Sequence, residues 1–183
     1  EVGGTFSGDG VVGNEFVPSS ANIGSNTIEY TITDGNGCTN TSDQTVMVYA
    51  LPDAGFTTLN AEYCVNDVAV TLVPNQLGGT FSGDGVTGNV FDPNDVAVLG
   101  AVTISYTLTD GNSCSNSSVQ VITVHGLPNA TFTGLAAEYC VDAIAVTLTP
   151  SEVGGTFSGD GVVGNEFVPA TANIGNNTIE YTI

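Results

Sequence analysis

The most informative absence in this chain is that of lysine and arginine. Its 183 residues include 19 acidic side chains, one histidine and no Lys or Arg, which gives a formal net charge of -19. Without a fixed cation the chain cannot neutralise phosphates, so the sequence excludes nucleic-acid binding through the backbone and a Walker-type phosphate loop. A basic patch for anionic lipid headgroups and catalysis by lysine are excluded on the same ground.

Several other features are missing as well. The chain has no Trp, no sustained helical period and no apolar run near the ~18 residues of a membrane-spanning helix, so direct membrane insertion is not expected. It opens without the basic segment of a signal peptide, so we expect an internal piece of a longer chain. Nevertheless 41% of its residues are hydrophobic, which favours a folded protein over a disordered one. Its 24 glycines and 7 prolines suit a turn-rich β protein.

An internal repeat decides the organisation of the chain. The octapeptide at residues 3–10 recurs at 78–85 and at 154–161, so successive copies start 75 and 76 residues apart. The two outer copies resemble each other most, because residues 1–32 and 152–183 differ at only three positions. A period of this length is about one small domain and predicts tandem units.

Leu-Pro steps at 51–52 and 127–128 mark the expected unit boundaries, because proline interrupts strand pairing. The chain then consists of a partial repeat at 1–50, a complete repeat at 51–126 and a partial repeat at 127–183. Short alternating segments bounded by turns predict an all-β fold, a sandwich of short strands. The strands expected in the complete unit lie at 54–59, 68–72, 79–82, 90–91, 102–110 and 119–124.

A hairpin sequence carries a family resemblance. The run Tyr106-Thr107-Leu108-Thr109-Asp110-Gly111-Asn112-Ser113-Cys114 resembles the YTxTDxNGC hairpin of bacterial Ig-like and PKD-like surface repeats, and so does Thr31-Ile32-Thr33-Asp34-Gly35-Asn36-Gly37-Cys38. Such repeats are familiar from very long cell-surface adhesins of gliding bacteria that use type IX secretion. The resemblance covers the whole chain. It implies tandem Ig-like β-sandwich repeats of about 76 residues. It also implies an extracellular location at the bacterial cell surface and a structural role.

The four cysteines occur at a fixed offset, two in each unit, and such spacing suggests disulfides in a secreted repeat. Within one unit the pair would be Cys64 and Cys114, closing a loop of about 50 residues worth roughly 4 kcal/mol in the chain-entropy model. The alternative is a bond across each unit junction, because an ordinary Ig topology places these two cysteines at opposite ends of the sandwich. The pair within one unit is slightly favoured. Cys38 and Cys140 are expected to have partners beyond this chain in either case.

The carboxylates have no cationic partners in the chain, and acidic, oxygen-rich turns suit Ca²⁺. The candidate metal ligands are turn residues that recur between copies: Asp34, Asn36, Asp67, Asp110, Asn112 and Asp142. Asp84 in Ser-Gly-Asp-Gly is a further candidate. None of them fits an EF-hand loop. The competing interpretation, which the sequence favours, is that Asp and Asn make the local hydrogen bonds of turns.

Nothing in the sequence points to catalysis. The single histidine, His125, has Tyr49 at its equivalent position in the first copy and belongs to no Ser-His-Asp motif. Phe81 and Tyr106 recur in all copies and are expected in the core rather than in a sugar-stacking platform. We therefore expect a non-catalytic segment of an extracellular fibre or adhesin stalk, with further copies of the repeat, in the same or in neighbouring chains, as partners. The alternative is a carbohydrate- or host-surface-binding module.

Overall fold

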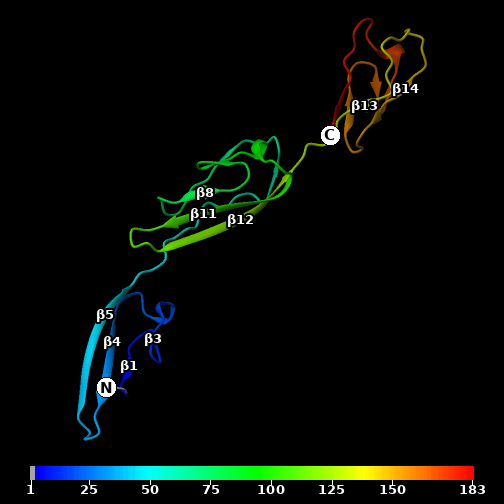
Figure 1. The fold of residues 1–183 in the computed structure, drawn as a ribbon. Coiled ribbons are helices and arrows are strands. Elements are labelled where there is room, and N and C mark those ends of the chain that lie inside the picture. Colours follow the sequence, from blue (N-terminus) through cyan, green and yellow to red (C-terminus); the bar gives the residue numbers. More distant parts are fainter. Residues whose placement is uncertain (1–2) are drawn as a thin grey trace. The chain divides into compact units, whose positions relative to one another are not determined.

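The computed structural model describes residues 3–183 and confirms the all-β class (Figure 1). Three single-turn 3-10 segments each begin at a proline: η1 (Pro18–Ser20), η2 (Pro93–Asp95) and η3 (Pro169–Thr171). Within residues 3–183 no helix is long and apolar enough to cross a membrane. The chain forms two compact units, Glu1–Val124 and His125–Ile183. The division lies close to the boundary expected after residue 126, and the three-part organisation stays a prediction.

Residues 51–125 contain two sheets. The larger sheet has the strand order β6-β12-β11-β8, and the smaller one has the order β7-β10-β9. The bounds are β6 (Glu62–Cys64), β7 (Val70–Thr71), β8 (Thr80–Ser82), β9 (Val86–Thr87), β10 (Val90–Phe91), β11 (Gly100–Thr109) and β12 (Ser115–His125). The strand expected at 102–110 is therefore confirmed, and the one expected at 119–124 is longer and begins at Ser115.

The hairpin of β11 and β12 is the longest strand pair of this part (Figure 1), with ten partners from Gly100↔Val124 to Thr109↔Ser115. The inward positions of β11 carry large apolar side chains that alternate with small outward-facing ones, as a half-buried strand requires. The buried side chains of β11 are Val102, Ile104, Tyr106 and Leu108. At the turn, Ser113 has a φ of 66°, a left-handed conformation that few residues other than glycine adopt.

The core of this part is made of residues from both sheets. Phe91 of β10 and Ile104 of β11 are both fully buried, at 0% exposure. The ring of Tyr63 meets Phe91 edge-on, with 5.5 Å between centroids. Other buried apolar side chains of the core are Ala54, Phe56, Leu59, Leu72, Val96, Val102, Tyr106, Leu108, Ile122 and Val124.

The segment 52–61 runs parallel to β12 and is held by side chains rather than by a backbone ladder. The strand expected at 54–59 is reduced to one bridge, Phe56↔Pro74. From the inward face of β12, Asn116 Nδ2 donates to the carbonyl oxygen of Pro52 (2.8 Å), Ser118 Oγ to that of Ala54 (2.6 Å), and Gln120 Nε2 to those of Phe56 (3.3 Å) and Thr57 (3.0 Å). In return the Leu59 N–H donates to Gln120 Oε1 at 2.9 Å. We call these contacts the β12 ladder.

The first repeat, residues 3–48, has the same strand pairing in its sheet β1-β4-β5 and in the small pair β2-β3. The bounds are β1 (Thr5–Ser7), β2 (Val11–Val12), β3 (Glu15–Phe16), β4 (Gly24–Thr33) and β5 (Thr39–Val48). The register Phe6↔Tyr30 matches Phe81↔Tyr106 of the second repeat. The Phe6 side chain is 43% exposed.

The unit His125–Ile183 repeats the same local pairings a third time. Its sheets are β13-β15, β14-β18-β17 and β16-β19. The bounds are β13 (Phe132–Thr133), β14 (Val146–Thr147), β15 (Thr149–Pro150), β16 (Thr156–Ser158), β17 (Val162–Val163), β18 (Glu166–Phe167) and β19 (Glu180–Thr182). The register Phe157↔Tyr181 again joins the repeated Phe and Tyr.

Candidate functional site

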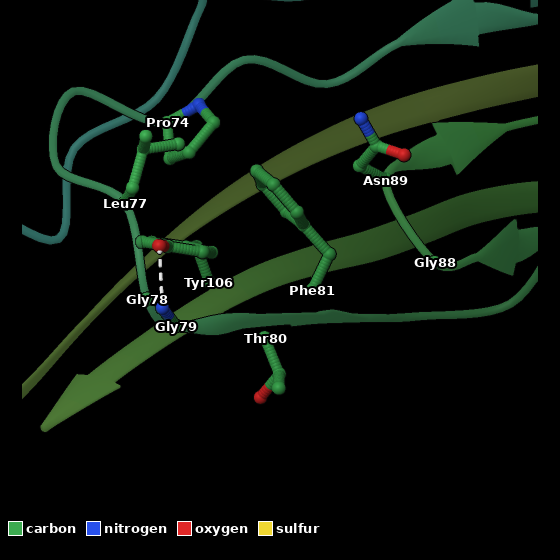
Figure 2. A pocket seen from close by; sticks show the side chains of 9 residues that line it. All are labelled: Pro74, Leu77, Gly78, Gly79, Thr80, Phe81, Gly88, Asn89 and Tyr106. Carbon is green, nitrogen blue, oxygen red and sulfur yellow. Dashed lines mark hydrogen bonds between the residues drawn. The ribbon is translucent and has the colours of Figure 1, made fainter.

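A shallow pocket of about 320 Å³ lies beside β8. Figure 2 shows the Phe81 side chain in it, between Tyr106 and Asn89. The complete lining is Pro74, Leu77, Gly78, Gly79, Thr80, Phe81, Gly88, Asn89 and Tyr106. Most of this wall is apolar or backbone, and it contains no carboxylate, cysteine or histidine. The pocket can therefore offer apolar contact and a few polar groups, but no acid, base or metal ligand.

The hydroxyl of Tyr106 is already occupied by the fold. It donates to the carbonyl oxygen of Gln76 at 2.7 Å and accepts from the N–H of Gly79 at 2.8 Å. The second of these bonds is drawn in Figure 2. A Cβ atom at Gly79 would lie 2.6 Å from Tyr106 Cζ, closer than real Cβ contacts come, so only glycine fits there. The repeated Gly-Gly-Thr-Phe motif therefore has a structural cause.

The same tyrosine arrangement is present in all three copies. The Gly155 N–H donates to Tyr181 Oη at 2.9 Å, and Gly4 N–H donates to Tyr30 Oη at 3.2 Å. The repeated phenylalanine packs on the tyrosine each time, with ring centroids 4.5 Å apart for Phe81 and Tyr106 and 4.6 Å apart for Phe157 and Tyr181. The repeated aromatics are thus packing residues, as the sequence predicted. No pattern in the sequence pointed to Leu77 or Asn89 in the pocket.

The Asp-Asn pairs proposed as metal ligands cap their own hairpin turns. Asp34 Oδ1 accepts from the N–H groups of Asn36 (2.9 Å) and Cys38 (2.8 Å). Asp110 Oδ1 accepts from those of Asn112 (2.9 Å) and Cys114 (2.9 Å). The bond from Cys38, then that from Asn36, lowers the pKa of Asp34 below its ordinary value of 3.8. The ionised Asp34 carboxylate therefore stabilises the turn fully at a pH above 3.8, and this stabilisation is lost as the pH falls through the lowered pKa.

The remaining candidates lie elsewhere. Asp67 Oδ2 accepts from the Cys64 N–H at 2.7 Å, in a turn that follows β6. Asp142 belongs to the equivalent turn of the third copy, where the Ala143 N–H donates to the Cys140 carbonyl oxygen. Asp84 Oδ2 accepts from the Ala97 N–H at 2.9 Å. Over residues 3–183 no three His, Cys, Asp or Glu side chains gather as a metal site would require. Calcium binding at these turns therefore stays a prediction.

We expect calcium removal to leave the stability of the chain unchanged. The carboxylates at the turns already accept backbone N–H bonds, so an added ion has little to gain from them. In thermal unfolding followed by circular dichroism, EDTA should shift Tm by less than about 1 °C, and millimolar Ca²⁺ should act no differently from Mg²⁺, because both only screen the negative charge. A rise of several degrees with Ca²⁺ alone would contradict this expectation and support the metal hypothesis.

The cysteines correct another expectation. All four are free, Cys114 half-buried and the others exposed. Cys114 directly precedes the first residue of β12. Cys64 is the last residue of β6, which begins after Ala61. The Ala61 carbonyl oxygen accepts from the Thr123 N–H, so β6 starts near the opposite end of β12. About ten residues of extended strand separate these positions, roughly 30 Å, and a disulfide needs Cα atoms within about 7 Å. A Cys64–Cys114 bond is therefore incompatible with this fold, and pairing with cysteines of further units stays a prediction.

Comparisons with known proteins assign no family to the chain. No protein-family model matches it, and no curated protein matches it either. The arguments about its role accordingly rest on the pairing, the pocket and the turn chemistry described above.

Proposed function

We propose that the chain is a non-catalytic structural segment of tandem Ig-like β-sandwich repeats, part of an extracellular fibre or adhesin stalk at a bacterial surface. The observation that carries the proposal is the threefold recurrence of one register, Phe6↔Tyr30, Phe81↔Tyr106 and Phe157↔Tyr181. Each time a glycine N–H donates to the tyrosine hydroxyl. In a stalk, each repeat has only to fold and contact its neighbours. The distinctive residues of this repeat stabilise its own fold, as that role requires. An enzyme or sensor would keep some of them for a ligand.

The path of the chain through residues 52–125 supports a mechanical role. The segment 52–61 and β12 stand at the two ends of this unit in sequence and run parallel to each other, joined by the β12 ladder. Tension on the two ends of the unit therefore shears these bonds together instead of opening them one by one. The resemblance of the hairpins to bacterial surface repeats supports the extracellular place, and the charge of -19 would keep neighbouring fibres apart.

Single-molecule pulling on the full chain tests this proposal. Unfolding of residues 51–126 should appear as one abrupt step, because the sheared bonds break cooperatively. The step should release up to about 270 Å of contour length, at ~3.6 Å per residue, less the length of the folded unit. A chain that lengthens smoothly, with no step of that size, would not suit a stalk. The same measurement after reduction should give the same step, since no disulfide lies within the unit.

A second candidate function, carbohydrate binding, is favoured by one observation, the apolar pocket of Figure 2 with Phe81 in it. Sugar rings pack on aromatic faces, and Asn89 and Thr80 could add hydrogen bonds. A glycan array would decide. Selective binding that is lost in Leu77→Ala, a lining residue 82% exposed, would favour a binding module over a stalk.

A further inference from the structure

One outward surface of residues 51–125 carries no charge over most of its length. The inward side chains of β11 and β12 face the core, so the alternate side chains point away from it. These outward side chains are those of Thr80 and Ser82 in β8 and of the odd-numbered residues 101–109 in β11 and 115–123 in β12. All of them are Ala, Ser, Thr or Val. We call these positions the neutral face, and Glu62 of β6 and His125 lie at one end of it.

The first repeat has the same strands but an acidic face. Where the second repeat has Ser105 and Val119, the first has Glu29 and Asp43. These two carboxylates stand directly opposite each other in the register of β4 and β5, as Ser105 and Val119 do in β11 and β12. Like charges in such a pair are destabilising. The third repeat has Glu180 at the position of Ser105. The second repeat therefore has a neutral surface that the other two lack.

The neutral face also has apolar side chains at its middle. Val119 and Val121 are 62% and 64% exposed, where β5 has Asp43 and a threonine. Next to Val119, the hydroxyls of Ser82 and Ser105 bond each other at 2.8 Å. Hydroxyls that are bonded to each other lose less than unpaired ones when water leaves them. Covering this face therefore has a low desolvation cost and removes exposed methyl groups from water.

We propose that two copies of this chain associate through their neutral faces, as a two-fold dimer in which the sheet β6-β12-β11-β8 of one copy packs on the same sheet of the other. A second copy fits this face by charge. Two chains with a net charge of -19 repel each other, and the repulsion is least where no carboxylates meet. A basic partner would gain little from a surface without carboxylates, and an acidic one would be repelled by the rest of the chain. The inference does not rest on a role in a stalk.

The area of the neutral face predicts weak association. Strands that pair over ten residues at ~3.4 Å per residue, three abreast at ~4.8 Å, cover roughly 500 Å² in each copy. Two such faces together bury about 1,000 Å², which is the lower limit of specific interfaces. We therefore expect a monomer at micromolar concentrations and a dimer toward the millimolar range. Because both copies are acidic, association should strengthen with salt.

Sedimentation equilibrium of the full chain tests the dimer. Between about 10 μM and about 1 mM protein the average mass should rise toward that of a dimer, and it should rise more at about 0.3 M salt than at about 0.05 M. Val119→Asp should weaken the dimer at least about tenfold, because it places a carboxylate against the apolar middle of the partner face. The first repeat has Asp43 at this position, so the fold tolerates the change. Ser105→Glu, which also copies the first repeat, should weaken the dimer as well.

Val90→Glu is the matched control. It adds the same charge as Val119→Asp, but on β10 of the other sheet, where the first and third repeats have Glu15 and Glu166. At about 0.3 M salt it should change the dimer Kd by less than about twofold. Conversely, Glu29→Ser combined with Asp43→Val gives the first repeat a neutral face and should raise the average mass above that of the native chain.

Three results would overturn the proposal. One is a chain that stays monomeric over the whole range at both salt concentrations, even if the face bound another neutral molecule such as a glycan. Another is a dimer that Val119→Asp and Ser105→Glu leave intact. The third is a dimer that Val90→Glu weakens as much as Val119→Asp, because then the net charge rather than the neutral face would control association.

Discussion

Replacing Phe91 by alanine is expected to lower the free energy of unfolding of residues 51–125 by about 3–5 kcal/mol. The ring is fully buried, in edge contact with Tyr63 and among the core side chains of both sheets. A unit of this size has a total stability of only about 4–11 kcal/mol. The variant should therefore be close to unfolding at room temperature. Hydrogen exchange of amides in β11 and β12, followed by mass spectrometry, reports this unit separately from the rest of the chain.

Two matched substitutions in the same protein control for this measurement. Phe16 occupies the equivalent position in the first repeat but is only half-buried there, so Phe16→Ala should cost less than half as much and leave exchange in β11 unchanged. Val121→Ala removes an apolar side chain from β12 itself at a position 64% exposed, and should stay within about 0.5 kcal/mol of the native chain. Equal losses in Phe91→Ala and Val121→Ala would mean that the core does not lie between the two sheets.

Local patterns predicted β11 well and β12 only in part. In β11 every inward position is large and apolar, so the two-residue period is visible in the sequence. In β12 only the inward Ile122 and Val124 are apolar, while the inward positions Asn116 and Ser118 are polar and conceal the first half of the strand. These polar side chains donate to carbonyl oxygens of segment 52–61, which lie 64 residues earlier in the sequence. No local pattern contains that information.

The candidate site was predictable in the same uneven way. The capping role of Asp34 and Asp110 follows from nearby turn residues, and the sequence favoured it over metal binding. The need for glycine at position 79 arises from the Thr107 carbonyl oxygen and the Tyr106 ring, which both come close because β8 pairs with β11. The Cys64–Cys114 expectation failed for a related reason: both cysteines belong to one unit, but the parallel course of segment 52–61 and β12 carries them to opposite ends. Topology, rather than spacing, decides which cysteines can meet.

Replacing Gln120 by alanine is expected to cost about 2 kcal/mol, the second-largest effect, although the residue is neither apolar nor fully buried. Its side chain accepts from the Leu59 N–H at 2.9 Å and donates to the carbonyl oxygens of Phe56 and Thr57. Truncation leaves these partly buried backbone groups without that partner, and each unsatisfied group costs about 1–3 kcal/mol unless water reaches it. Exchange at Leu59 and along β12 should quicken, and the unfolding force of residues 51–126 should fall, because the middle of the β12 ladder is lost.

The control for this variant is already present in the chain. Gln44 is the equivalent residue of β5, and its side chain is exposed. Gln44→Ala should therefore leave the stability of the chain unchanged. If both substitutions cost the same, the effect of Gln120 would come from strand propensity. The inter-sheet bonds, and the shear geometry built on them, would then lose their support.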